Sequence, residues 1–198
     1  MKIIVLALLV FCSSIVNAQE LILTRNSIGP LSLKEGDLIS VDLIKKIFPE
    51  YDVSHEIRSW EGPDFHSILV SKRNGDIVLS ISSYINDKNY EREKNAKEYT
   101  IDEIGLGTGL KDEYGIKVGD KLEKVFRIRG KNLNLISNHF NNTVGKDKIY
   151  YVFEIKPTPA EIKAQHGVNY RNPESVTIEE AIKKNPEIQD IVWNRILK

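Results

Sequence analysis

Two runs of apolar and serine residues, separated by a short polar stretch, give the clearest pattern in the chain. His66–Ser71 and Ile77–Ser82 are rich in β-branched residues, and Arg73-Asn74-Gly75-Asp76 lies between them. An Asn-Gly pair between two such runs is typical of a type I′ turn, in which both central residues have positive φ. The pattern therefore predicts a β-hairpin. Further strands are predicted on either side of it, over His55–Trp60 and Tyr99–Leu106.

Short helices are predicted where apolar residues recur at helical spacing. Ser40 is a typical N-cap for the first helix, and the second begins with the Asp120-x-x-Glu123 spacing of a capping box. The three predicted helices are Val41–Phe48, Asp120–Arg127 and Thr177–Lys184. The remaining predicted strands are Leu133–Phe140, Lys148–Lys156 and Ile188–Ile196.

One phrase occurs twice in the chain. Ile28–Phe48 and Tyr114–Phe126 each run from a glycine through a short apolar strand to a Gly-Asp pair and a helix. Neither a two-turn helix nor a sheet with one apolar face is complete alone, so each helix is expected to fold onto its own strands. Coincidence is the alternative, because Gly-Asp is common turn chemistry. We expect an α+β fold of two related helix-plus-antiparallel-strand halves, about 21–106 and 107–198, forming one mixed, mainly antiparallel sheet.

Two segments interrupt this order. Asn86–Glu98 has eight charged residues in thirteen and is expected to be a solvated loop or a charged helical excursion between strands. The alternative, functional interpretation is that the tip of this segment docks onto a partner. The stretch Pro157–Pro173 is rich in proline and is expected to be a long connection.

The N-terminus has the three parts of a secretory signal peptide. Lys2 supplies the positive start, Ile3–Phe11 is an unbroken apolar run, and Val16-Asn17-Ala18 gives the cleavage motif. The run is too short to span a bilayer, which needs about 20 residues. We expect residues 1–18 to be removed by cleavage between Ala18 and Gln19, leaving 19–198 as a single domain in the periplasm or outside the cell.

The only cysteine bears on that interpretation. Cys12 follows Phe11, whereas the signal peptidase of bacterial lipoproteins requires a small residue before the cysteine, so an outer-membrane lipid anchor is the less favoured alternative. Cleavage after Ala18 leaves no cysteine and hence no disulfide. Residues 19–198 hold 27 basic and 28 acidic side chains, because Lys2 is the one charged residue before them. This net charge of −1 does not indicate nucleic acid as a partner, and no second apolar stretch indicates a transmembrane segment.

The sequence contains no H-E-x-x-H, G-x-S-x-G, C-x-x-C or Walker motif. Gly105–Gly109 is glycine-rich but leads into charged residues instead of a helix, so it does not indicate a phosphate site. The four histidines lack metal-like spacing, although His55 and His66 could meet across neighbouring strands. We expect no catalytic residue, cofactor or metal. The partner-binding candidates are Trp60, Tyr90 and Arg92.

The order of elements resembles the YfeY-like family of RpoE-regulated lipoproteins of bacterial envelopes, a family of unknown function. The resemblance rests on three stretches of this sequence: Ile28-Gly29-Pro30-Leu31, Gly115–Phe126 and Ile188–Arg195. It covers about residues 21–195 and implies export without an established activity or cofactor. The chain departs from the pattern in lacking a convincing lipobox and in carrying the 86–98 insertion. The tandem layout is also similar to the β-lactamase-inhibitor-protein-like fold, an analogy of fold alone.

These features favour an exported, non-catalytic envelope protein that binds a protein or cell-wall component. Inhibition of an exported enzyme is one alternative. A small hydrolase is another, and it would require His55 or His66 to cluster with Glu61 or Asp64.

Overall fold

The computed structural model describes residues 21–34, 36–59, 63–130, 133–137, 141–145, 148–155 and 178–195. The predicted signal peptide with Ala18 and Gln19, the candidate Trp60 and the predicted connection 157–173 lie outside the described residues.

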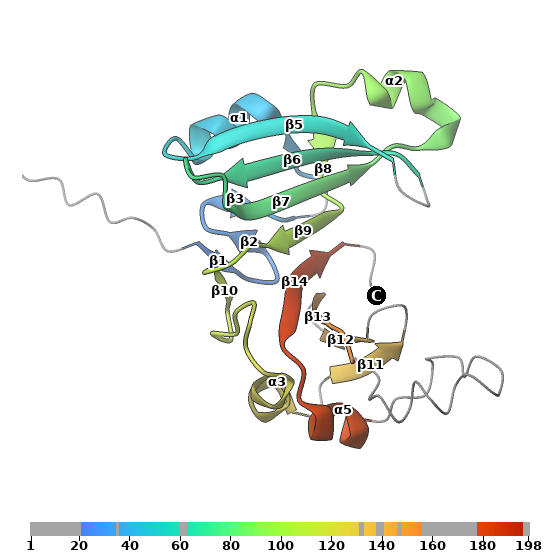
Figure 1. Cartoon of the computed structure of the whole chain (residues 1–198). Helices are drawn as coiled ribbons and strands as arrows, with labels where there is room; N and C mark the ends of the chain where they lie inside the picture. Colours follow the sequence, from blue (N-terminus) through green and yellow to red (C-terminus); the bar gives the residue numbers. More distant parts are fainter. Residues whose placement is uncertain are drawn as a thin grey trace, which may run out of the picture.

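Eight of the described strands form one antiparallel sheet in the order β11-β12-β13-β14-β9-β7-β6-β5 (Figure 1). The first half of the chain supplies four adjacent strands: β5 (Asp52–Arg58), β6 (Phe65–Ser71), β7 (Ile77–Tyr84) and β9 (Glu103–Leu106). The second half supplies the other four: β11 (Leu133–Ser137), β12 (Asn141–Gly145), β13 (Ile149–Phe153) and β14 (Ile188–Asn194). The fourth strands of the two halves, β9 and β14, pair with each other and join the halves.

In each half a helix precedes the four strands of the large sheet, and further helix is inserted between the third and fourth of these strands. The leading helices are α1 (Val41–Ile47) and α3 (Leu122–Arg129). The inserted helices are η1 (Asp87–Asn89) and α2 (Tyr90–Lys94) in the first half and α5 (Ile178–Lys184) in the second. The predicted α+β class with two related halves is therefore confirmed, and the 86–98 insertion is a charged helical excursion.

The repeated Gly-Asp phrase forms the same turn twice. Gly36 has φ +87° and Gly119 has φ +90°, a conformation that favours glycine. The following aspartate N–H donates to the lysine carbonyl three residues back, at 3.2 Å for Asp37 and 3.1 Å for Asp120. After the turn, β4 (Leu38–Ile39) pairs with β8 (Tyr99–Thr100) just before β9, and Lys121 bridges to Glu187 just before β14. In both halves the phrase thus forms the same glycine turn, followed by a β contact to the residues just before the joining strand.

The core lies on one side of the large sheet. α1 and α3 bury Ile44 and Val125 there, and a small sheet covers the junction of the halves. The small sheet has the order β10-β1-β2-β3 and consists of β10 (Lys111–Asp112), β1 (Ile22–Leu23), β2 (Ser27–Ile28) and β3 (Leu31–Ser32). The indole N–H of Trp193 on β14 donates to the carbonyl of Arg25 at 3.0 Å, fixing this small sheet to the second half.

The hairpin is confirmed, but the predicted type I′ turn is wrong. Gly75 has φ +89°, whereas Asn74 is not among the residues with positive φ. Gly75 N–H donates to the Lys72 carbonyl, and Lys72 N–H donates to that of Asp76, both at 2.8 Å. These bonds define a three-residue loop, a type I turn followed by a glycine bulge, which needs only one positive φ.

Two other local predictions differ from the structure. The strand predicted over Tyr99–Leu106 is divided between β8 and β9, because the buried Asp102 interrupts it and its carboxylate accepts the Tyr84 backbone N–H at 2.8 Å. Asp120 does not cap α3, since its carboxylate accepts from Lys117 N and Lys124 Nζ at 2.7 and 2.6 Å. The strand β12 was not predicted, because the polar Asn141-Asn142-Thr143 start lacks a β signature.

Candidate functional site

The side of the large sheet opposite the core, called the open face below, is the main candidate surface. Strand alternation sends Ile81, Ile104 and Ile191 into the core, so their neighbours point to the other side. No described helix covers this side. The neighbours that form the open face are Phe65, Ser67 and Leu69 on β6, Ser80, Ser82 and Tyr84 on β7, Glu103 and Gly105 on β9, Tyr150 and Val152 on β13, and Asp190, Val192 and Asn194 on β14.

A β-bulge aims two polar side chains at this face. The pairing of β13 with β14 runs from Val152–Asp190 directly to Phe153–Ile188, so β14 has an extra residue. Ile188 and Ile191 are both buried in the core, while Gln189 is exposed and Asp190 is half-buried. The bulge therefore breaks the alternation and places two consecutive side chains outside the core, a common device near functional sites.

Asp190 is a desolvated carboxylate without a compensating cation. Burial is the main cause that raises its pKa to about 6, and the nearby Glu103 raises it further. Its Oδ1 accepts the backbone N–H of Ile191 at 2.8 Å, which partly opposes the shift. No lysine or arginine among the described residues forms an ion pair with it. Such a perturbed carboxylate in a depression is typical of functional sites, although structural groups show it too.

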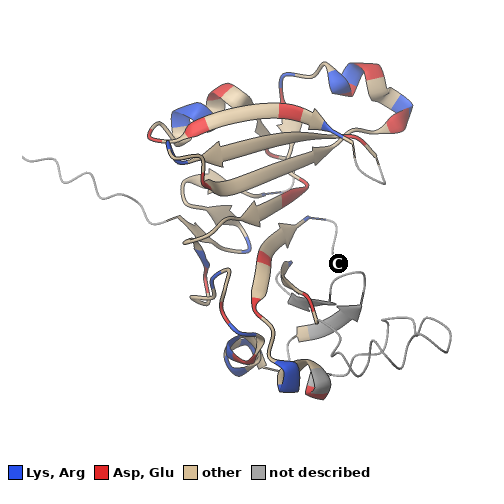
Figure 2. Ribbon diagram, in the orientation of Figure 1, with Lys and Arg blue, Asp and Glu red and all other residues tan. Residues whose placement is uncertain are grey.

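Glu103 lies on the neighbouring strand in a hydrogen-bonded cluster. Its Oε2 accepts from Asn194 Nδ2 at 3.0 Å and from the Tyr150 hydroxyl at 3.4 Å. Burial raises the pKa of Glu103, and the two hydrogen bonds act against that rise. Burial, and then Glu103, also hold the pKa of Tyr150 far above its usual value, so this phenol stays a neutral donor. Figure 2 shows that acidic residues occur on β9 and β14, the strands through which the halves pair.

A depression of about 540 Å³, called the central groove below, runs along the open face. Its floor includes Ser80, Gly105 and Asp190, and its far end reaches Arg58 on β5. The glycine leaves room for its neighbours, because a Cβ at Gly105 would lie 2.6 Å from Ser80 Oγ, which would have to shift, and 3.6 Å from Asp190 Oδ1. Small residues on β7 and β9 therefore make this part of the surface hollow.

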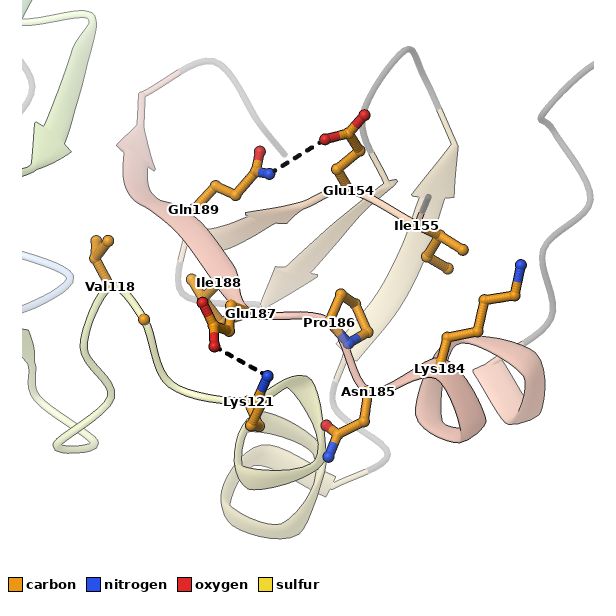
Figure 3. A pocket seen from close by; sticks show the side chains of 11 residues that line it. Val118, Lys121, Glu154, Ile155, Lys184, Asn185, Pro186, Glu187, Ile188 and Gln189 are labelled. Carbon is orange, nitrogen blue, oxygen red and sulfur yellow. Dashed lines mark hydrogen bonds and ion pairs between the residues drawn. The ribbon is translucent and has the colours of Figure 1, made fainter. Parts of the chain in front are cut away.

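A second depression of about 690 Å³ adjoins the first beside α5 (Figure 3). The two depressions share the lining residues Val118 and Gln189. Lys121 Nζ pairs with Glu187 at 3.0 Å across this second depression, and Gln189 Nε2 donates to Glu154 at 3.5 Å. Its polar groups are thus largely paired with one another, in contrast to Asp190.

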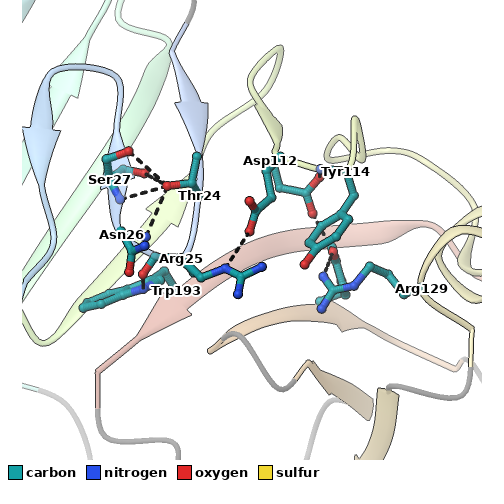
Figure 4. A network of polar contacts seen from close by, with 10 residues as sticks. Thr24, Arg25, Asn26, Ser27, Asp112, Tyr114, Arg129 and Trp193 are labelled. Carbon is teal, nitrogen blue, oxygen red and sulfur yellow. Dashed lines mark hydrogen bonds and ion pairs between the residues drawn. The ribbon is translucent and has the colours of Figure 1, made fainter.

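A buried polar network lies on the core side and has a structural explanation (Figure 4). The Tyr151 hydroxyl donates to Asp112 Oδ2 at 2.5 Å and accepts from Arg129 at 2.6 Å. Asp112 also accepts the backbone N–H groups of Tyr114 and Ile116, both at 2.9 Å, and the Arg129 guanidinium stacks 3.8 Å from the Tyr114 ring centroid. The network ties β10, α3 and β13 together and is closed to ligands by burial.

The two histidines of the hairpin region do meet, as their strand positions suggested. His55 Nε2 and His66 Nδ1 are 3.0 Å apart, and His66 Nε2 lies 2.8 Å from the Glu93 carbonyl on α2. The Tyr99 ring stacks on His55 and lies against His66 at a tilt of 34°. Since a carbonyl only accepts, His66 Nε2 donates to Glu93, and in this arrangement His66 Nδ1 accepts from His55 Nε2. The described residues contain no group of three or more metal-ligating side chains.

The structure gives the sequence-predicted candidates Tyr90 and Arg92 different surroundings. The Tyr90 hydroxyl donates to Asp64 Oδ2 at 2.6 Å, and Ser59 donates to Oδ1 at the same distance, so Tyr90 fastens α2 to the sheet. Asp64 thus accepts from these hydroxyls, and the described contacts do not include a pair of Asp64 with His55 or His66, one of the clusters that would favour a hydrolase. Arg92 projects from α2 with a 76% exposed side chain. Neither Tyr90 nor Arg92 lines the central groove.

The residues of the central groove were not recognised in the sequence. Asp190 and Gln189 occupy what looks like regular alternation, and the bulge that redirects them depends on their pairing with β13. Gly105 falls near the end of the strand predicted over Tyr99–Leu106, and the sequence offers one signal there: an isolated glycine in a strand suggests a bulge or a close approach.

Sequence comparison finds no protein-family model that matches and no significant match among curated proteins. The fold, in contrast, is similar to a solved structure, that of the uncharacterized protein yfeY from Escherichia coli, with a TM-score of 0.54 and 15% identity. The match covers 88% of this chain and 99% of that one. At this identity the likeness shows a YfeY-like fold and nothing further. No described helix is long and apolar enough to cross a membrane.

Proposed function

We propose that this protein is an exported, non-catalytic binding module of the bacterial cell envelope, holding a protein or cell-wall partner across its open face. Export is supported by the apolar N-terminal run followed by Val16-Asn17-Ala18. A lipid anchor is not part of the proposal, because Phe11 precedes the only cysteine.

The observation that carries the proposal is Asp190 in the central groove. Its carboxylate is desolvated, lacks a cation among the described residues, and points to a hollow built from Ser80 and Gly105. A charge held in this way lowers folding stability, and a partner that supplies a cationic or hydrogen-bond-donating group would satisfy it. The half-exposed Tyr84 and the neighbouring Phe65, 6.1 Å apart in an edge-to-face pair, would supply aromatic contacts.

A capture experiment tests this function. Immobilised protein is exposed to envelope extract, and the retained components are compared for wild type, Asp190→Ala, Tyr84→Ala and the control Asp42→Ala. Asp42 is an exposed aspartate on α1, on the opposite side of the sheet. We expect a component that wild type and D42A retain and that D190A and Y84A lose. Equal retention by the wild type and all three variants, or by none of the four proteins, would reject the open face as the binding surface.

The sequence-predicted candidates enter the same experiment as separate variants. Trp60→Ala and Arg92→Ala test whether these two side chains contact the partner. Loss of capture in R92A but not in D190A would move the binding surface from the groove to the 86–98 insertion.

A further inference from the structure

The strand β5 is an unprotected edge of the large sheet. It is last in the strand order and pairs with β6 along all seven residues without an irregularity. Six of its seven residues are exposed. An edge of this length without proline or bulge presents unpaired backbone groups to another strand.

The hydrogen-bonding pattern shows which backbone groups are free. Ile85 N–H donates to the Asp64 carbonyl at 2.8 Å, immediately beyond the paired region of β6 and β7. Even-numbered residues of β6 therefore bond with β7 and odd-numbered residues with β5, because bonded pairs alternate in antiparallel strands. In β5 the bonded partners are the even-numbered residues, which leaves the N–H and C=O groups of Val53, His55 and Ile57 pointing away from the sheet.

The side chains of β5 are self-complementary about its central residue. An antiparallel copy related by a two-fold axis at His55 would place Asp52 opposite Arg58 twice and Val53 opposite Ile57 twice. The charged pairs would lie on the open-face side and the apolar pairs on the other. Opposite charges and apolar residues in directly opposed positions each stabilise a strand pair, and a two-fold contact requires this kind of self-match.

We propose that a second copy of this chain docks on β5, forming a symmetric dimer in which β5 pairs antiparallel with its counterpart about His55 and the two large sheets become continuous. The central His55 pair does not oppose this register near neutral pH. Burial, and then the neighbouring His66, lower the pKa of His55, so the two imidazoles face each other uncharged.

The charges of β5 can also be understood as protection of an edge against aggregation. Protection alone requires charge but not complementarity in one register. Arg58 pairs within the strand with Glu56, but its side chain is still half exposed. Its guanidinium is therefore accessible to an Asp52 of another copy. The two explanations differ in what charge reversal does, since purely protective charges can be reversed without consequence.

Charge reversal with mixing provides the test, using the purified protein in sedimentation velocity up to about 1 mM, as befits a contact of the small, weak class. Asp52→Arg and Arg58→Asp each place like charges opposite each other in the homodimer. We expect each to raise the dimer dissociation constant by about tenfold or more. Mixing the two variants restores both opposite-charge pairs, so the mixture should form a heterodimer within about threefold of the wild-type affinity.

The outcomes decide the proposal. Circular dichroism first verifies that both exposed substitutions leave the fold intact. A wild type that stays monomeric at every concentration overturns the dimer. Variants that dimerise like wild type, or a mixture that stays monomeric, overturn the β5 contact. Because this experiment uses purified protein alone, its result is independent of partner capture by the open face.

Discussion

Asp190 lies where the two halves meet, and its raised pKa predicts how the stability of the fold depends on pH. A folded-state pKa of about 6, against an ordinary 3.8, means that the folded protein binds this proton more tightly than the unfolded chain. The contribution of protonated Asp190 to the free energy of unfolding is complete below pH 3.8 and is lost as pH rises through about 6. Asp190→Asn removes the charge. It should therefore stabilise the fold by roughly 1–3 kcal/mol at pH 8 and hardly at all near pH 4. Urea unfolding at both pH values measures this, with D42N as the control, and an equal effect at both would contradict it.

Gly105 on β9 and Gly107 in the following turn have different neighbours. A Cβ at Gly107 would lie 1.9 Å from the carbonyl oxygen of Ile77, which is backbone, whereas at Gly105 the nearest atom is the rotatable Ser80 hydroxyl. Gly107→Ala should cost about 3 kcal/mol or more, and Gly105→Ala about 1 kcal/mol. Denaturant midpoints of the two variants check the order, and equal losses would show that the chain near Ile77 shifts easily.

At the scale of elements, α3 depends on a residue far away in sequence. Its N-terminal groups are satisfied by Asn185 Oδ1, which accepts from Glu123 N, and by the Pro186 carbonyl, which accepts from Leu122 N, both at 2.9 Å. Asn185 also has φ +41°, which asparagine tolerates better than alanine. Asn185→Ala should therefore cost about 1–2 kcal/mol. Asn185→Gly, which accommodates the positive φ but removes the acceptor, should still lose stability in urea unfolding, and a glycine variant as stable as wild type would assign the effect to backbone conformation alone.

The elements also show what the sequence could predict. α1 starts after Ser40 as expected, since the cap and the apolar stripe are local: the Ser40 hydroxyl accepts from Leu43 N at 3.2 Å. The cap of α3 could not be predicted, because it comes from 62 residues away and leaves Asp120 to bind Lys124 instead. In the same way β12 is a strand through its neighbours β11 and β13, and its own sequence carries little β preference.

At the scale of the whole molecule, the duplicated phrase predicted two related halves on one mainly antiparallel sheet, because each short helix needs its own strands to bury its apolar side. The sequence did not predict which strands join the halves. Pairing of β9 with β14 is set by contacts between Ile104 and Trp193 on opposing strands. The central groove follows from that junction, which is why its residues were missed while the fold was not.

The junction also determines whether the halves unfold together. Ile104 is fully buried and belongs to one hydrophobic cluster that contains α1 residues of the first half and α3 residues of the second. Ile104→Ala should lower the unfolding free energy by about 2–5 kcal/mol, the usual cost of such a cavity. Because the core is shared, we expect one transition to remain, with far-UV circular dichroism and tryptophan fluorescence giving the same midpoint. Ala96, at the margin of the cluster, offers a milder comparison as Ala96→Gly. Separate midpoints for the two probes in I104A would mean that each half holds its own core and that β9 and β14 merely touch.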